Sequence, residues 1–211
     1  VVECGDKNRF ISYNDIYLQD SNPYSYTYNT SFDGEGAITS AIDYVVSEEL
    51  PQMYVLEGHG EAELPETFKD QLEKENVETH SFSLLNEDQI PEDADVIMIY
   101  GPTSDISVEE ETQLMSYVAN GGKLLVMAGP TKEGTLTNLY GLLNDYGVTA
   151  SDGIIVEGDR THYAFQTPYV LLPNIEQNDM TDSLIQANYF VIMPLAQGLN
   201  VSGYSPSGTV S

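Results

Sequence analysis

A histidine and a glutamate with the potential for acid–base or ligand chemistry share a glycine-rich turn near residue 60. The apolar run from Gln52 to Glu57 leads directly into Gly58, His59, Gly60 and Glu61. Glycine adopts backbone conformations that a Cβ forbids, so the turn can present both side chains at the carboxyl end of a strand, where open α/β sheets bind ligands. The alternative interpretation is structural, because two glycines also make a simple strand-to-helix turn and Glu61 favours the positive end of the next helix.

Nucleophilic catalysis lacks the residues that it needs. A catalytic serine or cysteine requires a base within hydrogen-bond reach, and the only cysteine, Cys4, lies far in sequence from the strand ends. Ser104 and Ser107 have no neighbouring histidine in sequence, and the chain contains no Gly-x-Ser-x-Gly elbow. The segment 33–36 has two glycines but lacks the lysine of a phosphate-binding loop. We therefore predict no catalytic residues.

Metal binding has little support in the residue pattern. The three histidines, His59, His80 and His162, are not spaced as ligands of one ion. Glu61 and Asp105 could join His59 around an ion, but the loops lack the Asp-x-Asp-x-Asp-Gly pattern of a calcium site. We therefore predict no metal and no cofactor.

Three short apolar runs predict the strands that position the turn. They are residues 52–57, 95–100 and 122–127, and their nearly continuous apolar composition is typical of parallel strands that are covered on both faces. The carboxyl ends of parallel strands share one edge of a sheet, so we expect three loops to converge there: Gly58 to Glu61, Gly101 to Ser107 and Gly129 to Thr131. Residues 77–84 and 153–156 are further strand candidates.

Helical segments fall between these strands. The pattern predicts helices over 35–46, 66–75, 108–119 and 135–146, and Ser107 with Glu110 forms a capping-box pattern at the start of the third. In the first helix we expect one buried stripe that consists of Ile38, Ala41, Ile42, Val45 and Val46. Alternating strands and helices at this spacing predict an α/β fold, with an open, mainly parallel sheet and helices on both faces.

The two ends of the chain differ from this central region. Residues 1–13 indicate a hairpin with strands over 1–4 and 10–13 and a turn over 5–8. A connector rich in tyrosine, serine and asparagine follows over 18–31. After residue 159 we expect irregular structure packed on the sheet, with one short helix near 181–187. We thus predict a hairpin and connector from a preceding domain over 1–31, an α/β domain over 32–200 and a polar tail over 201–211. The absence of an initiator methionine favours a piece of a longer protein.

The charge of the chain narrows its partners. Among 211 residues, 34 are acidic and 7 are basic, which gives a formal net charge of −27. Such a charge repels nucleic acid and anionic lipid, so we predict no nucleic-acid partner and favour cationic or neutral ligands. No apolar run is long enough to span a bilayer. The acids gather around 61–66, 87–95 and 105–111, where we expect a solvated surface.

Five segments together resemble the GldG-like, ABC-transporter-auxiliary family over about residues 30 to 200. They are Phe32 to Val45, Val55 to Glu61, Ile90 to Val96, Gly101 to Ser107 and Tyr117 to Val126. The resemblance implies a flavodoxin-like or class I glutamine-amidotransferase-like domain that is not known as an enzyme. Members of this family are membrane-anchored bacterial proteins with a large extracytoplasmic part. They accompany an ABC permease and ATPase, and some belong to gliding-motility systems. The opening hairpin then resembles the tail of a preceding extracytoplasmic domain.

The sequence thus predicts a non-catalytic extracytoplasmic domain of an ABC-transporter accessory subunit. We expect it to act in binding or assembly with the permease and ATPase, and to contact the membrane only through anchors outside this chain. Two alternatives stay open: a degenerate hydrolase that uses His59 and Glu61, and a module that senses a sugar or peptide.

The expected ligand-binding residues lie in two of the three loops. They are Gly58, His59, Gly60, Glu61, Thr103, Ser104 and Asp105. If the first loop serves binding, His59 and Glu61 are exposed, and replacing both leaves the melting temperature nearly unchanged.

Overall fold

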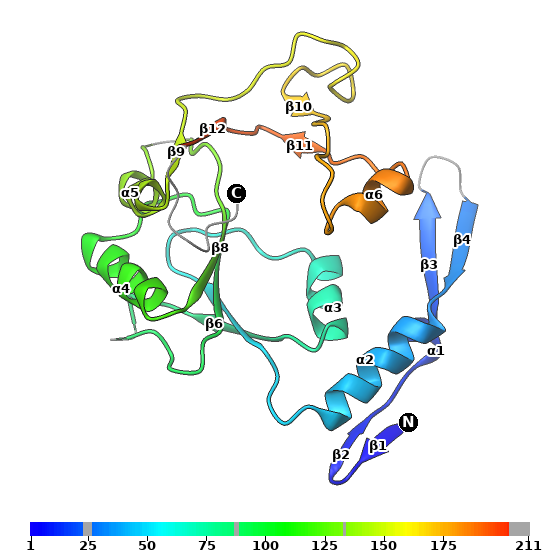
Figure 1. The fold of residues 1–211 in the computed structure, drawn as a ribbon. Coiled ribbons are helices and arrows are strands. Elements are labelled where there is room, and N and C mark those ends of the chain that lie inside the picture. Colours follow the sequence, from blue (N-terminus) through cyan, green and yellow to red (C-terminus); the bar gives the residue numbers. More distant parts are fainter. Residues whose placement is uncertain (23–26, 87–88, 133, 203–211) are drawn as a thin grey trace.

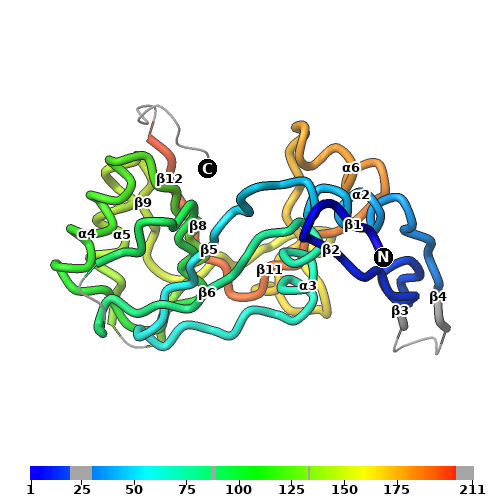
Figure 2. Tube along the Cα trace, turned by 90° about the horizontal axis from the view of Figure 1, so that it is seen from below, coloured from blue at the N-terminus to red at the C-terminus, as the bar shows by residue number. Residues whose placement is uncertain are grey.

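The computed structural model describes residues 1–22, 27–86, 89–132 and 134–202, so the predicted polar tail beyond residue 202 lies outside the described residues. The largest sheet has four strands, and regions from the two ends of the chain lie beside it (Figure 1 and Figure 2). No described helix is both long and apolar enough to cross a membrane.

The four strands of the main sheet all run in parallel. Their spatial order is β6 (Glu78–Phe82), β5 (Gln52–Leu56), β7 (Val96–Tyr100) and β8 (Lys123–Met127). Met53 of β5 is paired with Val96 of β7, which is paired in turn with Lys123 of β8. The predicted strands at 52–57, 95–100 and 122–127 are therefore confirmed as neighbours, with β7 in the middle.

Helices cover both faces of this sheet. On one face, α4 (Val108–Ala119) and α5 (Thr137–Asp145) complete a core whose most buried members are Leu56, Ile97, Ile99, Leu114, Leu139 and Leu142. On the other face, α3 (Glu66–Lys74) lies over Met53 and Met98. Burying one such side chain contributes roughly 1.5–3 kcal/mol. Because β7 is covered on both sides, its sequence is continuously apolar, and the predicted α/β class is confirmed.

The N-terminal residues form two hairpins. β1 (Val2–Cys4) and β2 (Lys7–Arg9) form a hairpin at the predicted place, and a short helix, α1 (Tyr13–Ile16), follows. The predicted second strand over 10–13 is wrong, because the turn is shorter than expected and Ser12 caps α1. β3 (Tyr17–Asn22) and β4 (Thr27–Phe32) then pair in antiparallel register, so the expected connector over 18–31 is wrong. Tyrosine and threonine in this stretch favour strands, and the pairing satisfies the backbone groups of both strands.

The helix α2 (Gly34–Val46) packs against β1, β2 and α1. Its buried side chains are Ala37, Ala41 and Val45, which are small enough to let the hairpin approach closely. The predicted buried stripe also contained Ile38, Ile42 and Val46, and for these three residues the prediction is wrong, because all three are exposed.

Charged groups join this N-terminal region to α3. Lys74 forms an ion pair with Asp33, and Arg9 forms an ion pair with Glu73 at 3.1 Å. The junction therefore depends on polar contacts at least in part, whereas α2 buries its small apolar residues within the N-terminal region.

The C-terminal region consists of short elements. β9 (Val148–Ala150) pairs with β12 (Leu199–Val201), and β10 (Val170–Leu171) pairs with β11 (Met193–Pro194). The helix expected near 181–187 is present as α6 (Asp182–Gln186). The strand predicted over 153–156 is wrong, because Gly153 turns the chain with a φ of 82° and the apolar residues after it remain exposed.

Candidate functional site

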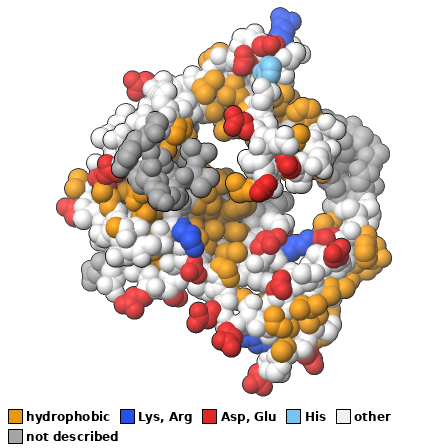
Figure 3. Space-filling view, in the orientation of Figure 1, with side chains coloured by type: hydrophobic (Ala, Val, Ile, Leu, Met, Phe, Trp, Pro, Cys, Tyr) orange, Lys and Arg blue, Asp and Glu red, His pale blue; other side chains and the backbone are white. Residues whose placement is uncertain are grey.

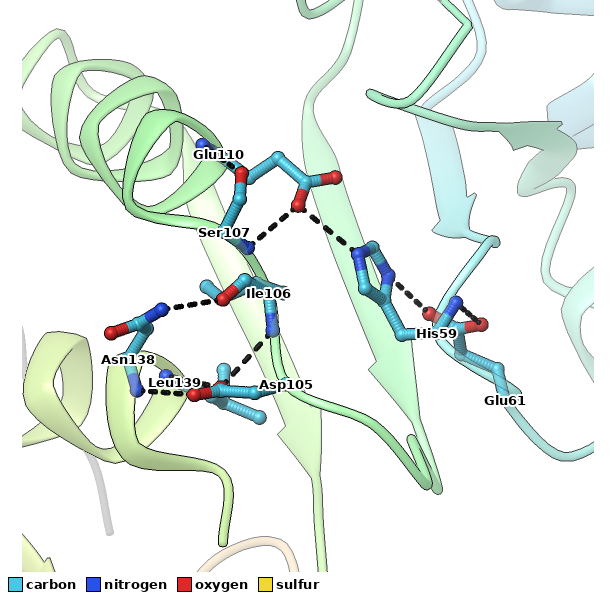
Figure 4. A network of polar contacts seen from close by, with 8 residues as sticks. All are labelled: His59, Glu61, Asp105, Ile106, Ser107, Glu110, Asn138 and Leu139. Carbon is cyan, nitrogen blue, oxygen red and sulfur yellow. Dashed lines mark hydrogen bonds and ion pairs between the residues drawn. The ribbon is translucent and has the colours of Figure 1, made fainter. Parts of the chain in front are cut away.

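His59 lies at the centre of a buried polar network, between the loop after β5 and the start of α4 (Figure 4). Its side chain is only 4% exposed. Nδ1 lies 3.0 Å from Oε1 of Glu61, and Nε2 lies 3.1 Å from Oε2 of Glu110. The His59 backbone N–H also donates to Glu61 Oε2 at 2.8 Å. We call the three side chains His59, Glu61 and Glu110 the histidine clasp.

Glu110 reaches the clasp because of the way α4 begins. Ser107 is the N-cap of this helix, and its hydroxyl accepts a hydrogen bond from Glu110 N at 3.1 Å. In return, Glu110 Oε2 accepts one from Ser107 N at 2.8 Å, which completes the predicted capping box. The same Oε2 atom faces His59, so one carboxylate oxygen caps a helix and anchors the neighbouring loop.

The two carboxylates change the protonation of the clasp. The hydrogen bond with Glu61 raises the pKa of His59 above its usual value; burial opposes this shift and contact with Glu110 adds to it. Burial acts to raise the pKa of Glu61 and of Glu110. Hydrogen bonds from His59 and from backbone N–H groups outweigh burial, and the pKa of each carboxyl is lowered. The arrangement therefore favours a protonated imidazolium between two carboxylates.

This geometry limits the chemistry that His59 can perform. Both ring nitrogens face carboxylates, and the two carboxylates lie on opposite sides of the ring (Figure 4). Acting as a general base would require His59 to give up one of these contacts. The two glutamates also cannot chelate one ion together with a ring nitrogen, and the described part of the chain holds no metal-binding group of three or more such side chains.

The backbone of the turn is tied to the loop after β7. The carbonyl of His59 accepts hydrogen bonds from Thr103 N and Ser104 N, each at 2.9 Å. Gly60 has a φ of 71°, and a Cβ at this position would collide with the hydroxyl of Thr103. The glycine is therefore required both for its left-handed backbone and for the close approach of the two loops.

Asp105 also has a structural role. Its carboxylate accepts hydrogen bonds from Asn138 N at 2.8 Å and from Leu139 N at 3.1 Å, in the first turn of α5 (Figure 4). The N-cap residue of that helix is Leu136, which has no side-chain oxygen to accept them. Asp105 thus supplies the missing cap from another loop, and its negative charge suits the helix N-terminus.

A cleft of about 540 Å³ lies beside the turn. Its walls come from residues 55–58 and 60–64, from Lys69 of α3 and from Thr79 to Ser81 of β6, and its acidic members are Glu57, Glu61 and Glu63. Gly58 and Gly60 also line it, whereas Thr103, Ser104 and Asp105 do not.

The structure thus brings two of the three predicted loops together through hydrogen bonds. The third, over 129–131, is tied back on itself by a bond from Thr131 to the carbonyl of Gly134. Thr103 and Ser104 are exposed, but the expectation that His59 and Glu61 are exposed is wrong, because the clasp buries them. Asp105 and Glu110 likewise do not belong to a purely solvated acidic surface.

Glu110 is the residue of the network that the sequence did not single out as a partner of His59. Its capping-box spacing was readable, and so was the adjacency of the strands that precede the two loops. Both signals together place the first turn of α4 beside the turn after β5. These two signals do not predict which glutamate of that first turn contacts His59.

Fold and site together define an α/β domain in which a parallel sheet carries a clasped histidine at its carboxyl edge. Residues 50–196 match the family described as an ABC-type uncharacterized transport system, and the chain belongs to this family. The match begins after α2 and is shorter than the range of the resemblance seen in the sequence.

Among solved structures, the fold is similar to that of the "mmIFT52 N-terminal domain", with a TM-score of 0.53 and 19% sequence identity. The similarity covers 71% of this chain and 73% of that chain, and it supports the fold alone. No curated protein matches the sequence.

Proposed function

We propose that this chain is a non-catalytic, extracytoplasmic domain of a bacterial ABC-transporter accessory subunit, and that it acts in assembly with the permease and ATPase. Membership of a transport-system family over residues 50–196 is the observation that carries the proposal. In the same proposal, anchors outside this chain hold the protein at the membrane. A place in a gliding-motility system is one form that such a function takes.

The histidine clasp supports a structural role for His59 and Glu61 rather than a catalytic one. A catalytic histidine needs a free nitrogen that faces a reacting group, and both nitrogens of His59 face carboxylates. Cys4, the one cysteine of the chain, lies in β1 of the N-terminal hairpin, outside the main sheet (Figure 1 and Figure 2). The clasp therefore fixes the shape of the loop, and the binding surface consists of the groups around it.

The proposed binding surface is the rim that the clasp holds in place. It consists of the exposed residues Thr103 and Ser104, the backbone at Gly58 and Gly60, and the acidic cleft beside them. Glu57 and Glu63 on the cleft favour a partner or ligand that brings positive or neutral groups. Asp105 positions the loop from below and does not contact the partner in this proposal.

Co-purification of the whole transport complex tests this proposal. Ser104→Arg places a bulky cation on the rim at an exposed position. We expect it to reduce recovery of the permease and ATPase with the accessory subunit, without a change in melting temperature. Ser116→Arg on α4 is the matched control, because Ser116 is equally exposed and lies away from the rim. Equal recovery with both variants would remove the rim from the proposed interface.

A hydrolase assay tests the non-catalytic part separately. The purified chain should show no amidase or esterase turnover above background. Turnover that is lost with Ser104→Ala, in a variant that remains folded, would overturn the non-catalytic assignment.

A further inference from the structure

Three apolar side chains form an exposed ridge along α2. Ile38, Ile42 and Val46 are 47%, 44% and 57% exposed, and their spacing of four residues places them in one line on the helix. Figure 3 shows the corresponding apolar band over α2, at the lower right of the view, with acidic side chains on both sides. We call these three residues the α2 face.

The α2 face is additional to the side of the helix that the fold buries. Ala37, Ala41 and Val45 already pack against the N-terminal hairpin. A surface helix normally has one apolar stripe and a polar remainder. α2 has a second apolar stripe beside the first, and no described element covers it.

An aromatic cluster lies next to the N-terminal end of α2. Tyr13 stacks on Tyr17 with ring centroids 4.6 Å apart, and Tyr17 meets Phe32 edge-on at 5.5 Å. The ring of Phe32 lies against Gly34, the first residue of the helix. Phe32 is 70% exposed, so the apolar surface continues beyond the helix itself.

The charges around the α2 face are acidic. Glu35 and Asp43 are exposed on the same helix, and Glu48 and Glu49 follow its C-terminus. None of these four carboxylates forms an ion pair with a described residue.

The basic residues of the neighbourhood are already engaged. Lys7 donates to the carbonyl of Ser47, Arg9 pairs with Glu73, and Lys74 pairs with Asp33. The bond of Lys7 to a neutral carbonyl does not cancel its charge, but the four carboxylates named above outnumber this single cation. The net charge beside the α2 face is therefore negative, and it remains available to a partner.

We propose that the α2 face binds an amphipathic helix of a partner protein that carries lysine or arginine beside its apolar stripe. Side chains four residues apart form a ridge that fits the groove of a second helix, and the acidic rim attracts the cations that flank it. A second copy of this chain fits poorly, since it presents the same acidic rim and the same net charge of −27. Anionic lipid is repelled for the same reason.

This inference rests on the proposed function only in that both involve a partner protein. The α2 face lies outside the family match over 50–196 and apart from the rim at Ser104. Its test uses the purified chain and no transporter subunit, so the two proposals can fail independently.

Two synthetic peptides of about 18 residues provide the probe, a length that presents several helical turns. Both contain the same numbers of leucine and lysine, but only one places the leucines on a single helical face. We expect the amphipathic peptide to bind the chain more tightly than the scrambled one at about 0.15 M salt, where long-range attraction is screened. The triple substitution Ile38→Ser, Ile42→Ser and Val46→Ser should lower the affinity for the amphipathic peptide by roughly tenfold or more, to the affinity of the scrambled peptide.

Matched variants separate this site from general stickiness. Tyr189→Ser, Phe190→Ser and Ile192→Ser remove three apolar side chains that are 50–78% exposed in the C-terminal region, and they should leave the affinity unchanged. The double substitution Glu35→Lys and Asp43→Lys should lower the affinity for the amphipathic peptide, although it leaves the three apolar side chains of the α2 face unchanged. Circular dichroism and melting curves check that each variant is folded.

Three results would overturn the proposal. The first is equal affinity for the two peptides, and the second is an affinity that the triple substitution in α2 does not change. The third is concentration-dependent dimerisation, or binding to anionic vesicles, that disappears with the same triple substitution. Such dimerisation would assign the α2 face to a second copy of the chain, and such vesicle binding would assign it to lipid.

Discussion

The loop at the carboxyl edge of the sheet and the outer side of α2 invert the usual distribution of polar and apolar groups. The loop buries a histidine and two glutamates, and each of the three is held by hydrogen bonds. α2 leaves two isoleucines and a valine exposed to water, although its smaller residues are buried. Buried polar groups that hydrogen-bond to one another indicate a structural part, and in the clasp this holds for every side-chain N and O atom except Oε1 of Glu110, which has no partner among the described residues. Exposed apolar groups without a cover indicate a surface for binding.

Removal of the central histidine should have the largest effect, and it tests whether the buried clasp stabilises the fold. His59→Ala leaves two buried carboxylates without their donor, and breaking a buried pair typically costs about 3 kcal/mol or more. We expect a fall of that order in the free energy of unfolding, measured by urea denaturation. His80→Ala serves as the control, because His80 is exposed on β6 and should cost less than about 0.5 kcal/mol. Similar costs for both variants would show that the clasp does not stabilise the fold.

The contribution of the clasp should depend on pH. The folded-state pKa of His59 is raised, so its contribution is complete below the ordinary value of 6.5 and is lost as the pH rises through the folded value. The two glutamates have lowered folded pKa values. Their contribution is complete above 4.5 and is lost as the pH falls through those values. The destabilisation by His59→Ala should therefore be largest between pH 4.5 and 6.5 and smaller at alkaline pH.

Titration of His59 by NMR measures the pKa of this single group directly. Replacing Glu61 by Gln weakens the hydrogen bond that contributes most to the shift and removes the charge of that partner, so the pKa of His59 should fall toward its ordinary value. The direction of the change is decisive here: an unchanged or higher pKa in the variant would contradict the assignment of Glu61 as the main partner.

Loss of the cap from Asp105 should have a smaller effect. Asp105→Ala removes the acceptor for two N–H groups of α5, and losing a helix cap costs roughly 0.5–2 kcal/mol. Thermal unfolding measures it. Asp152→Ala is a suitable comparison because this aspartate is exposed in a loop. If Asp105 instead serves only ligand binding, the two variants should have the same melting temperature.

The smallest effect is expected on α2. Ile42→Ala removes an exposed side chain and should change the free energy of unfolding by less than about 0.5 kcal/mol. Val45→Ala, on the buried side of the same helix, should cost more, since it leaves space against the hairpin. A larger cost at Ile42 would mean that this side of α2 is packed in solution.

Local patterns in the sequence gave a reliable picture of the sheet. Residues 95–100 are apolar at nearly every position because β7 is covered on both faces. The capping box of Ser107 and Glu110 was equally readable, since it depends on residues three apart. Parallel pairing of β5 with β7 then followed from the alternation of strands and helices.

Features that depend on tertiary contacts were not readable in the same way. The polar turn at His59 gives no local sign of burial, because the cover comes from Glu110, 51 residues away. The side of α2 that would be buried was misjudged for a related reason. Hydrophobicity favoured Ile38 and Ile42, but close approach of the hairpin selected the small Ala37 and Ala41. The sequence of the turn at His59, or of α2, does not by itself indicate which residues of another element will pack against it.

The shared oxygen of Glu110 sets an order of events in folding. Oε2 of Glu110 accepts hydrogen bonds from both Ser107 N and His59 Nε2, so the loop and the first turn of α4 close on one atom. The capping box places that atom locally, but His59 reaches it only after β5 and β7 have paired across the intervening chain, a long-range contact that forms slowly. The loop should therefore become ordered late. In native-state hydrogen exchange, the amides of His59 and Ser107 should lose protection in the same opening event.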